Sequence, residues 1–114
     1  MNLQEFKAIV AHRPETLEFA EVIELIHSLY LYAPAKFRNG NVENEAGSNE
    51  GSCKIFAFAK LQGLTQLQTL HCFGEYYRID VLEHPDASDH GNIRQFMEHS
   101  WAGVEFESEA LTPR

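Results

Sequence analysis

Hydrophobic residues recur at helical spacing through the first third of the chain. Leu3, Phe6, Ile9 and Val10 fall on one face of a short helix that ends before Pro14. Pro14 suits the first turn of a second helix, which the pattern extends to about Tyr32. This second helix carries a broad apolar stripe made of Phe19, Val22, Ile23, Ile26, Leu29 and Tyr30. The pattern therefore predicts two amphipathic helices before residue 34.

Residues 34–51 have no hydrophobic period. This segment contains four asparagines and three glycines, and its Asn39-Gly40 pair predicts a tight turn. An irregular segment of this length inside a small domain is often functional. We therefore expect it to contribute to a site.

A third helix is predicted from Cys53 to Gly63, with Ser52 as its N-cap. Its apolar residues leave almost no polar face: Ile55, Phe56, Ala57, Phe58 and Ala59. A helix that is apolar all round must be covered by its neighbours, so this one is expected to be central. Gly63 supplies a stop signal.

Residues 65–82 allow two interpretations. Thr65 and Gln68 match a capping box, and the apolar residues that follow keep the helical period. The stretch 76–81 (YYRIDV) is also rich in β-formers and alternates weakly, as in a strand. The capping box and the period agree with each other, so they favour helix.

The C-terminal third predicts one more helix and an extended tail. The helix runs from about His90 to His99, with Ile93, Phe96 and Met97 facing inward. Residues 101–106 (WAGVEF) read as an extended segment that folds back on the core.

These elements predict a mainly α fold. Residues 1–114 are expected to form a compact single-domain bundle of about five helices around a buried central helix. The alternative is an α+β domain with a hairpin at about residues 68–82.

The composition of the chain limits which classes of binding partner and which cellular location are expected. Seventeen acidic against nine basic residues give a net charge of −8, which disfavours binding to phosphate backbones, so no nucleic-acid partner is expected. No apolar run is long enough to span a bilayer, and the N-terminus lacks signal-peptide architecture. No membrane partner is expected, and the two cysteines are expected to be reduced thiols in a cytoplasmic protein.

Cys53 is the first candidate for chemistry. A thiol at a helix N-terminus beside Lys54 is placed where the thiolate is favoured. His90 could act as its base, with Asn49 or Asn92 as orienting or oxyanion group. The competing interpretation is that Cys53 is a small buried core residue, because free cysteines are among the most buried residue types.

Metal and cofactor sites are not predicted. Glu24 and His27 form only half of a di-iron motif, and the remaining histidines show no pair at ligand spacing. The loop before Lys54 fails the spacing of a phosphate-binding loop.

A pattern that runs through most of the chain resembles the HopJ type III effector family. It covers about residues 19–111 and centres on the run 49–59 (NEGSCKIFAFA). The other matching positions are Asn39-Gly40, Asn44, Ala46-Gly47, Thr69-Leu70, Phe73-Gly74, Tyr76-Tyr77-Arg78, Asp80-Val81-Leu82, Asp89-His90, Asn92-Ile93-Arg94, Phe96, Trp101, Gly103 and Phe106. The resemblance implies a type III effector homologue, which could be exported by a type III system, and carries over no molecular activity.

Three functions remain as hypotheses. The first is a small binding or regulatory module for a protein or small-molecule partner, with a polar pocket built from the 39–51 loop, Arg78 and His90. The second is a thiol enzyme that uses Cys53 and His90. The third is a secreted effector. The candidate binding residues are Asn39, Asn44, Asn49, Glu50, Ser52, Lys54, Arg78, Asn92 and Arg94.

Overall fold

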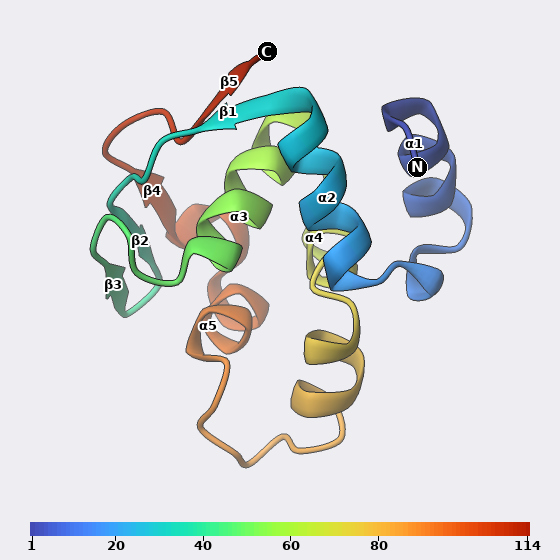
Figure 1. The fold of residues 1–114 in the computed structure, drawn as a ribbon. Coiled ribbons are helices and arrows are strands. Elements are labelled where there is room, and N and C mark those ends of the chain that lie inside the picture. The colour runs from blue at the N-terminus through green and yellow to red at the C-terminus, as the bar shows by residue number, and fades with distance from the viewer.

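The computed structural model describes residues 1–114 (Figure 1). Its helices are α1 (Leu3–His12), α2 (Phe19–Leu29), α3 (Glu50–Gln62), α4 (Gln66–His71) and α5 (Gly91–His99), with a π-helix η2 (Tyr76–Val81) and 3-10 turns at Pro14–Thr16 and Ser100–Gly103. Its strands are β1 (Tyr30–Tyr32), β2 (Phe37–Asn39), β3 (Val42–Asn44), β4 (Val104–Phe106) and β5 (Leu111–Pro113).

Two small antiparallel sheets make the fold α+β rather than purely helical. One sheet pairs β1 with β5, and the other has the order β3-β2-β4. The mainly helical prediction is therefore correct only in part, and the predicted alternative placed its hairpin wrongly. The observed hairpin is β2–β3, in the segment expected to be irregular, and its two-residue turn contains Gly40 with φ +59°. Gln66–His71 and Tyr76–Val81 are helical, as the capping box at Thr65 indicated, but a turn at residues 72–74, with Gly74 at φ +59°, separates the two helices.

The third predicted helix is central, as expected. Phe56, Phe58 and Ile55 of α3 are fully buried. The ring of Phe56 contacts rings from other elements, namely Phe37, Phe73, Phe96 and Trp101. These contacts join both sides of the molecule around α3, which lies between α2 and the β2–β3 hairpin in Figure 1.

The start of α3 differs from the prediction. The helix begins at Glu50, and Asn49 rather than Ser52 precedes it in the left-handed conformation, with φ 51° and ψ 48°. Asparagine is one of the few non-glycine residues that adopt this conformation readily, because its short polar side chain can bond locally. The helix end at Gly63 is confirmed, with φ +66°.

The second predicted helix is divided. Pro14 starts a separate 3-10 turn, α2 begins only at Phe19, and Tyr30–Tyr32 leave the helix to pair with β5. Leu17 is buried in an extended conformation between the two helical pieces. The chain can make this break because Glu18 and Glu21 form a capping box at the start of α2.

The C-terminal third follows the prediction closely. Ile93 and Phe96 of α5 are buried as predicted, but Met97, which was expected to face inward, is 38% exposed and lines a surface hollow with Val81 and Pro85. The tail folds back as expected, since Trp101 Nε1 donates to the carbonyl of Leu64 at 2.9 Å and β4 pairs with β2.

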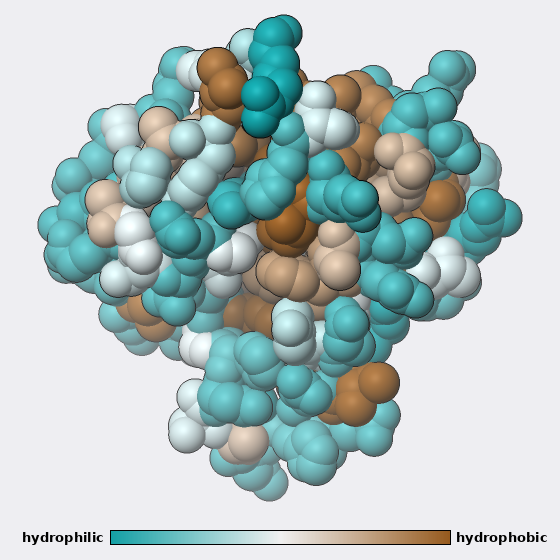
Figure 2. Space-filling model, in the orientation of Figure 1, coloured by the Kyte–Doolittle hydropathy of each residue, from teal (hydrophilic) through white to brown (hydrophobic).

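No helix of the fold has the length and apolar character needed to cross a membrane. Polar residues cover most of the face in Figure 2, and the hydrophobic ones on it lie in small scattered patches.

Candidate functional site

A pocket of about 330 Å³ opens where the N-terminal ends of α3 and α5 come together beside η2. It has a polar side and an apolar side. The lining residues are Phe19, Asn49, Gly51, Ser52, Phe73, Tyr76, His90, Gly91, Asn92 and Ile93. The pocket thus brings together four segments that are distant in the sequence.

His90 is the one basic side chain that lines this pocket. Its Nε2 lies 3.0 Å from Oδ2 of Asp80 and 3.8 Å from Oδ2 of Asp89. The ring of Tyr76 lies against it, with 5.3 Å between ring centroids. Tyr76 and Asp80 stand four residues apart on η2, so both side chains reach the same neighbour. The π-helix therefore holds the imidazole from two directions.

Both helices that meet at the pocket begin without a side-chain cap. Asn49 and His90 precede α3 and α5 in nearly identical left-handed conformations, with φ 51° and 52°. Neither terminus has a side-chain capping hydrogen bond. The N–H groups in the first turn of a helix have no partner within the helix, and the helix dipole is positive there. The polar side of the pocket is consequently rich in hydrogen-bond donors.

A buried asparagine network fixes the two helix starts relative to each other. Asn49 donates to Oδ1 of Asn44 at 2.7 Å, and Asn92 donates to the same oxygen at 2.9 Å. Asn44 and Asn39 each donate to Oδ1 of Asn92 at 3.1 Å, and Asn39 also donates to the Asn92 carbonyl at 2.8 Å. Asn39, Asn44 and Asn92 are at most 6% exposed. The polar side is therefore preorganised.

Three aromatic rings form the apolar side. The ring of Phe19 lies edge-on to Tyr76 at 5.0 Å and stacks on Phe73 at 6.5 Å, both measured between centroids. Phe19 also lies over the start of α3, where a Cβ on Gly51 would stand 2.9 Å from its Cζ. A glycine at position 51 thus allows the ring to approach the helix terminus.

Cys53 and His90 do not share a hydrogen bond. The Cys53 thiol is buried and donates weakly to the carbonyl of Ala35, at 3.7 Å. Burial raises the pKa of the Cys53 thiol, with smaller opposing contributions from Ala35 and Tyr32. The thiolate expected at this helix start is therefore not favoured, and the competing interpretation of Cys53 as a buried core residue describes the observed environment.

Thiol labelling gives a direct check. Both cysteines are buried and free, and burial raises the pKa of Cys72 to about 12. We expect 5,5′-dithiobis(2-nitrobenzoate) at pH 7.5 to find no rapidly reacting thiol in the native protein and two after unfolding in guanidinium chloride. A native thiol that reacts within seconds, and more slowly in a His90→Ala variant, would restore the thiol-enzyme hypothesis.

Several predicted site residues lie away from the pocket. Glu50 accepts a hydrogen bond from the Tyr32 hydroxyl at 3.2 Å, and Lys54 Nζ lies 4.6 Å from the centroid of the Tyr32 ring. Arg94 closes the loop before α5, with bonds of 2.7 and 2.8 Å to the carbonyl and carboxylate of Asp89. Arg78 bonds to Leu17 and to His71 rather than to the 39–51 loop. The expected pocket is thus built without Arg78.

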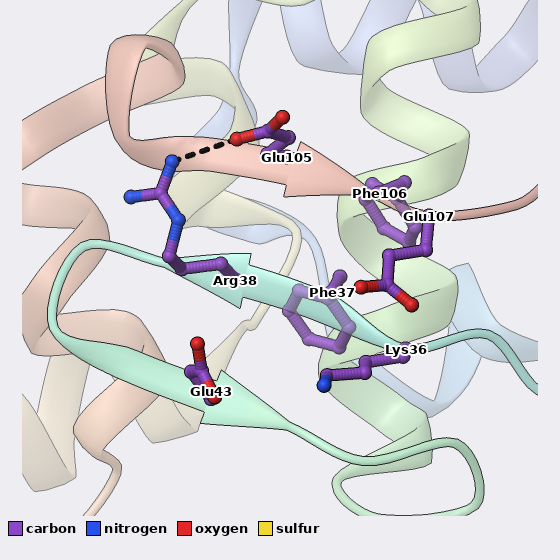
Figure 3. A pocket seen from close by; sticks show the side chains of 7 residues that line it. All are labelled: Lys36, Phe37, Arg38, Glu43, Glu105, Phe106 and Glu107. Carbon is purple, nitrogen blue, oxygen red and sulfur yellow. Dashed lines mark hydrogen bonds and ion pairs between the residues drawn. The ribbon is translucent and has the colours of Figure 1, made fainter.

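A larger hollow, of about 500 Å³, lies on the sheet β3-β2-β4 (Figure 3). Its charged residues come from two segments that are distant in the sequence, 36–43 and 105–107, and Arg38 reaches Oε2 of Glu105 at 2.8 Å. The rings of Phe37 and Phe106 stack at 5.0 Å beneath them. Arg38 faces glutamates on both neighbouring strands, Glu43 and Glu105, so its charge is neutralised within the sheet. This surface has the character of a solvated sheet face.

Sequence reasoning brought four of its candidates to the pocket: Asn49, Ser52, His90 and Asn92. It missed the aromatic side and the Asp80 partner of His90. The spacing of Tyr76 and Asp80 was an available signal, because residues four apart on a helix share a face. Nothing local in the sequence indicated that Phe19 would reach the start of α3.

No group of three or more His, Cys, Asp or Glu side chains is arranged to hold a metal ion. The 3.0 Å contact of His90 Nε2 with Asp80 orients the imidazole within the pocket.

The fold and the site define a small α+β domain with a preorganised polar and aromatic pocket. The chain belongs to the HopJ type III effector family, whose model matches residues 3–111. It is also similar to a crystal structure of a protein of unknown function, VPA0580, with 49% identity and a TM-score of 0.98. That similarity covers 100% of this chain and 95% of the other. No curated protein matches the sequence.

Proposed function

We propose that this HopJ-family protein is a small binding module and that the pocket between α3, α5 and η2 is its ligand site. One observation carries the proposal: His90 is held by Asp80 and Tyr76 at the polar end of a pocket whose other side consists of aromatic rings. Ligand pockets in proteins typically combine an apolar lining with a few fixed polar groups.

The lining chemistry indicates the kind of ligand. The Ser52 hydroxyl and the first-turn N–H groups can donate to one acceptor, and His90, whose Nε2 is paired with Asp80, can donate to it through Nδ1 as an imidazolium. Phe19, Phe73 and Tyr76 offer ring faces and edges to a flat apolar group. We therefore propose a small molecule that has a flat apolar part and a carboxylate or phosphate group.

Phenyl phosphate and benzylamine test this proposal as oppositely charged probes of similar size. In ¹H–¹⁵N NMR titrations, phenyl phosphate is expected to shift the amide signals of Gly51, Ser52 and Gly91, and benzylamine is expected to leave them in place. His90→Ala removes a charge-assisted hydrogen bond, so its Kd for phenyl phosphate is expected to rise about tenfold.

His84→Ala is the matched control, because His84 lies exposed in the loop between η2 and α5. Its Kd is expected to stay within about twofold of the parent value. Amide shifts that cluster at another part of the surface would contradict the proposal. Equal shifts with phenyl phosphate and with benzylamine would contradict it as well.

Export as an effector is a second candidate, favoured by the family match. A reporter enzyme fused after residue 50 should then leave a cell that has a type III apparatus and stay inside a matched strain without it. Retention of the fusion in both strains would count against export of this protein.

A further inference from the structure

Arg78 ties two separate segments together behind the aromatic side of the pocket. Its guanidinium donates to the carbonyl of Leu17, in the turn before α2, and to the carbonyl of His71 at 3.3 Å. The same group lies 3.3 Å from Nδ1 of His71. Arginine can only donate, so Nδ1 must accept and the ring proton of neutral His71 must be on Nε2.

His71 is half-buried at the end of α4 and is faced by three groups. Arg78 of η2 is beside its Nδ1, Tyr77 meets its ring edge-to-face at 5.4 Å, and Glu15 of the first 3-10 turn supplies the nearby negative charge. Burial and the Arg78 charge lower the pKa of His71 below its ordinary value of 6.5, while Glu15 opposes this shift. Neutral His71 is therefore the form that the fold favours.

Protonation of His71 changes this arrangement in two ways. It removes the acceptor at Nδ1, and it places an imidazolium within 3.3 Å of the guanidinium. Both effects weaken the hold of Arg78 on its partners. The Leu17 carbonyl shares that guanidinium, so the turn before α2 is affected as well.

The same turn leads directly into Phe19, the first residue of α2 and one of the three aromatic rings of the pocket. Phe19 follows Leu17 by two residues, and its N–H donates to Oε1 of Glu75 at 3.3 Å. Its ring packs against Tyr76, which lies on the same π-helix as Arg78. A change at Arg78 is thereby transmitted to Phe19 through the backbone and to Tyr76 through η2.

We propose that Arg78 and His71 form a pH-sensitive latch that fixes Phe19 at the pocket and releases it when His71 is protonated. The effect on binding rests on the proposed function of the pocket. The movement of the turn before α2 is independent of that proposed function, so it is tested without ligand. A negative result for the turn therefore leaves the binding proposal standing, and a negative result for binding leaves the turn proposal standing.

NMR titration of the full chain between pH 7.5 and 4.5 provides the test. The ring signals of His71 are expected to titrate with a midpoint below 6.5, and the amide signals of Glu18 and Phe19 are expected to shift with the same midpoint. In His71→Asn, the amide oxygen can still accept from Arg78 but cannot titrate, so the shifts at residues 18 and 19 are expected to disappear.

A second variant separates this response from titration within the pocket. His90→Asn removes the pocket imidazole and is expected to keep the shifts at Glu18 and Phe19. Titration of His71 without any shift of the Glu18 and Phe19 amide signals would overturn the latch. So would amide shifts that persist in His71→Asn, or amide shifts that vanish in His90→Asn. If His71→Asn does not fold, the comparison of midpoints in the parent protein decides the question alone.

Discussion

Gly74→Ala is expected to destabilise the protein by about 3 kcal/mol. Gly74 adopts φ +59°, and a Cβ at this position would stand 2.5 Å from the backbone nitrogen of Phe19 and 3.1 Å from the carbonyl carbon of Glu18. Backbone atoms cannot move aside as the end of a side chain can. Arg78 and Glu75 also hold residues 17–19 in place through hydrogen bonds, so this backbone cannot easily move away from the added Cβ.

Gly63→Ala is the matched control for this change. Gly63 has a similar φ of +66°, but a Cβ there would meet nothing within 4 Å. Gly63→Ala is therefore expected to lose only the stability that a Cβ costs in the left-handed backbone conformation, about 1 kcal/mol. Urea unfolding followed by Trp101 fluorescence measures both values. Equal losses in the two variants would mean that the close approach at Phe19 contributes nothing.

Asn92→Ala is expected to cost about 3 kcal/mol, because it removes three hydrogen bonds of the buried network: those that Asn39 and Asn44 donate to Oδ1 of Asn92, and the one that Asn92 donates to Oδ1 of Asn44. Removing a partner from a buried polar group costs more than the net value of the hydrogen bond, since the remaining group stays desolvated. The same change should loosen the two helix starts at the pocket. Urea unfolding measures the loss, and amide hydrogen exchange at Gly51 and Gly91 measures the loosening.

Asn41→Ala tests whether the effect depends on burial. Asn41 lies in the turn of the β2–β3 hairpin, which also carries Asn39 and Asn44 of the network, but Asn41 is exposed. Its loss is expected to stay within about 0.5 kcal/mol. A cost for Asn92→Ala as small as that of Asn41→Ala would show that the network does not stabilise the fold.

The pH dependence of stability follows from His71. Its pKa is lowered in the folded protein, first by burial and then by Arg78, so the unfolded chain binds the proton more tightly. The contribution of His71 to stability is present above about pH 6.5 and decreases as the pH falls below that value. Urea midpoints measured at pH 7.5 and 5.5 should therefore differ less for His71→Asn than for the parent protein.

The predicted site shows how far local patterns reach. Asn49 and Ser52 were predicted site residues because a polar loop leads into a helix there. His90 was predicted because it stands at another helix start. All three line the pocket. Cys53 was marked by the same loop, yet its thiol is buried against Ala35. Residues 52 and 53 point in different directions from one helix turn, and the sequence alone did not show which side would face the pocket.

The sequence by itself determined the features that depend on neighbours within a few residues. These are the capping box at Thr65, the stop at Gly63, the apolar character of α3 and the turn at Gly40. The family pattern also belongs to the sequence, and the match over residues 3–111 confirms it. Such signals survive because a cap, a stop or a turn is decided mainly by local backbone preferences and hydrogen bonds.

Only the tertiary structure decided the strands, the burial of Cys53 and the composition of the pocket. Each strand has three residues, too few to show a period, and β1 and β2 gain their partners β5 and β4 from the far end of the chain. The pocket likewise needs Phe19, the start of α3, η2 and the start of α5 in one place. Contacts between distant segments depend on how the whole core packs, so no short stretch of sequence specifies them.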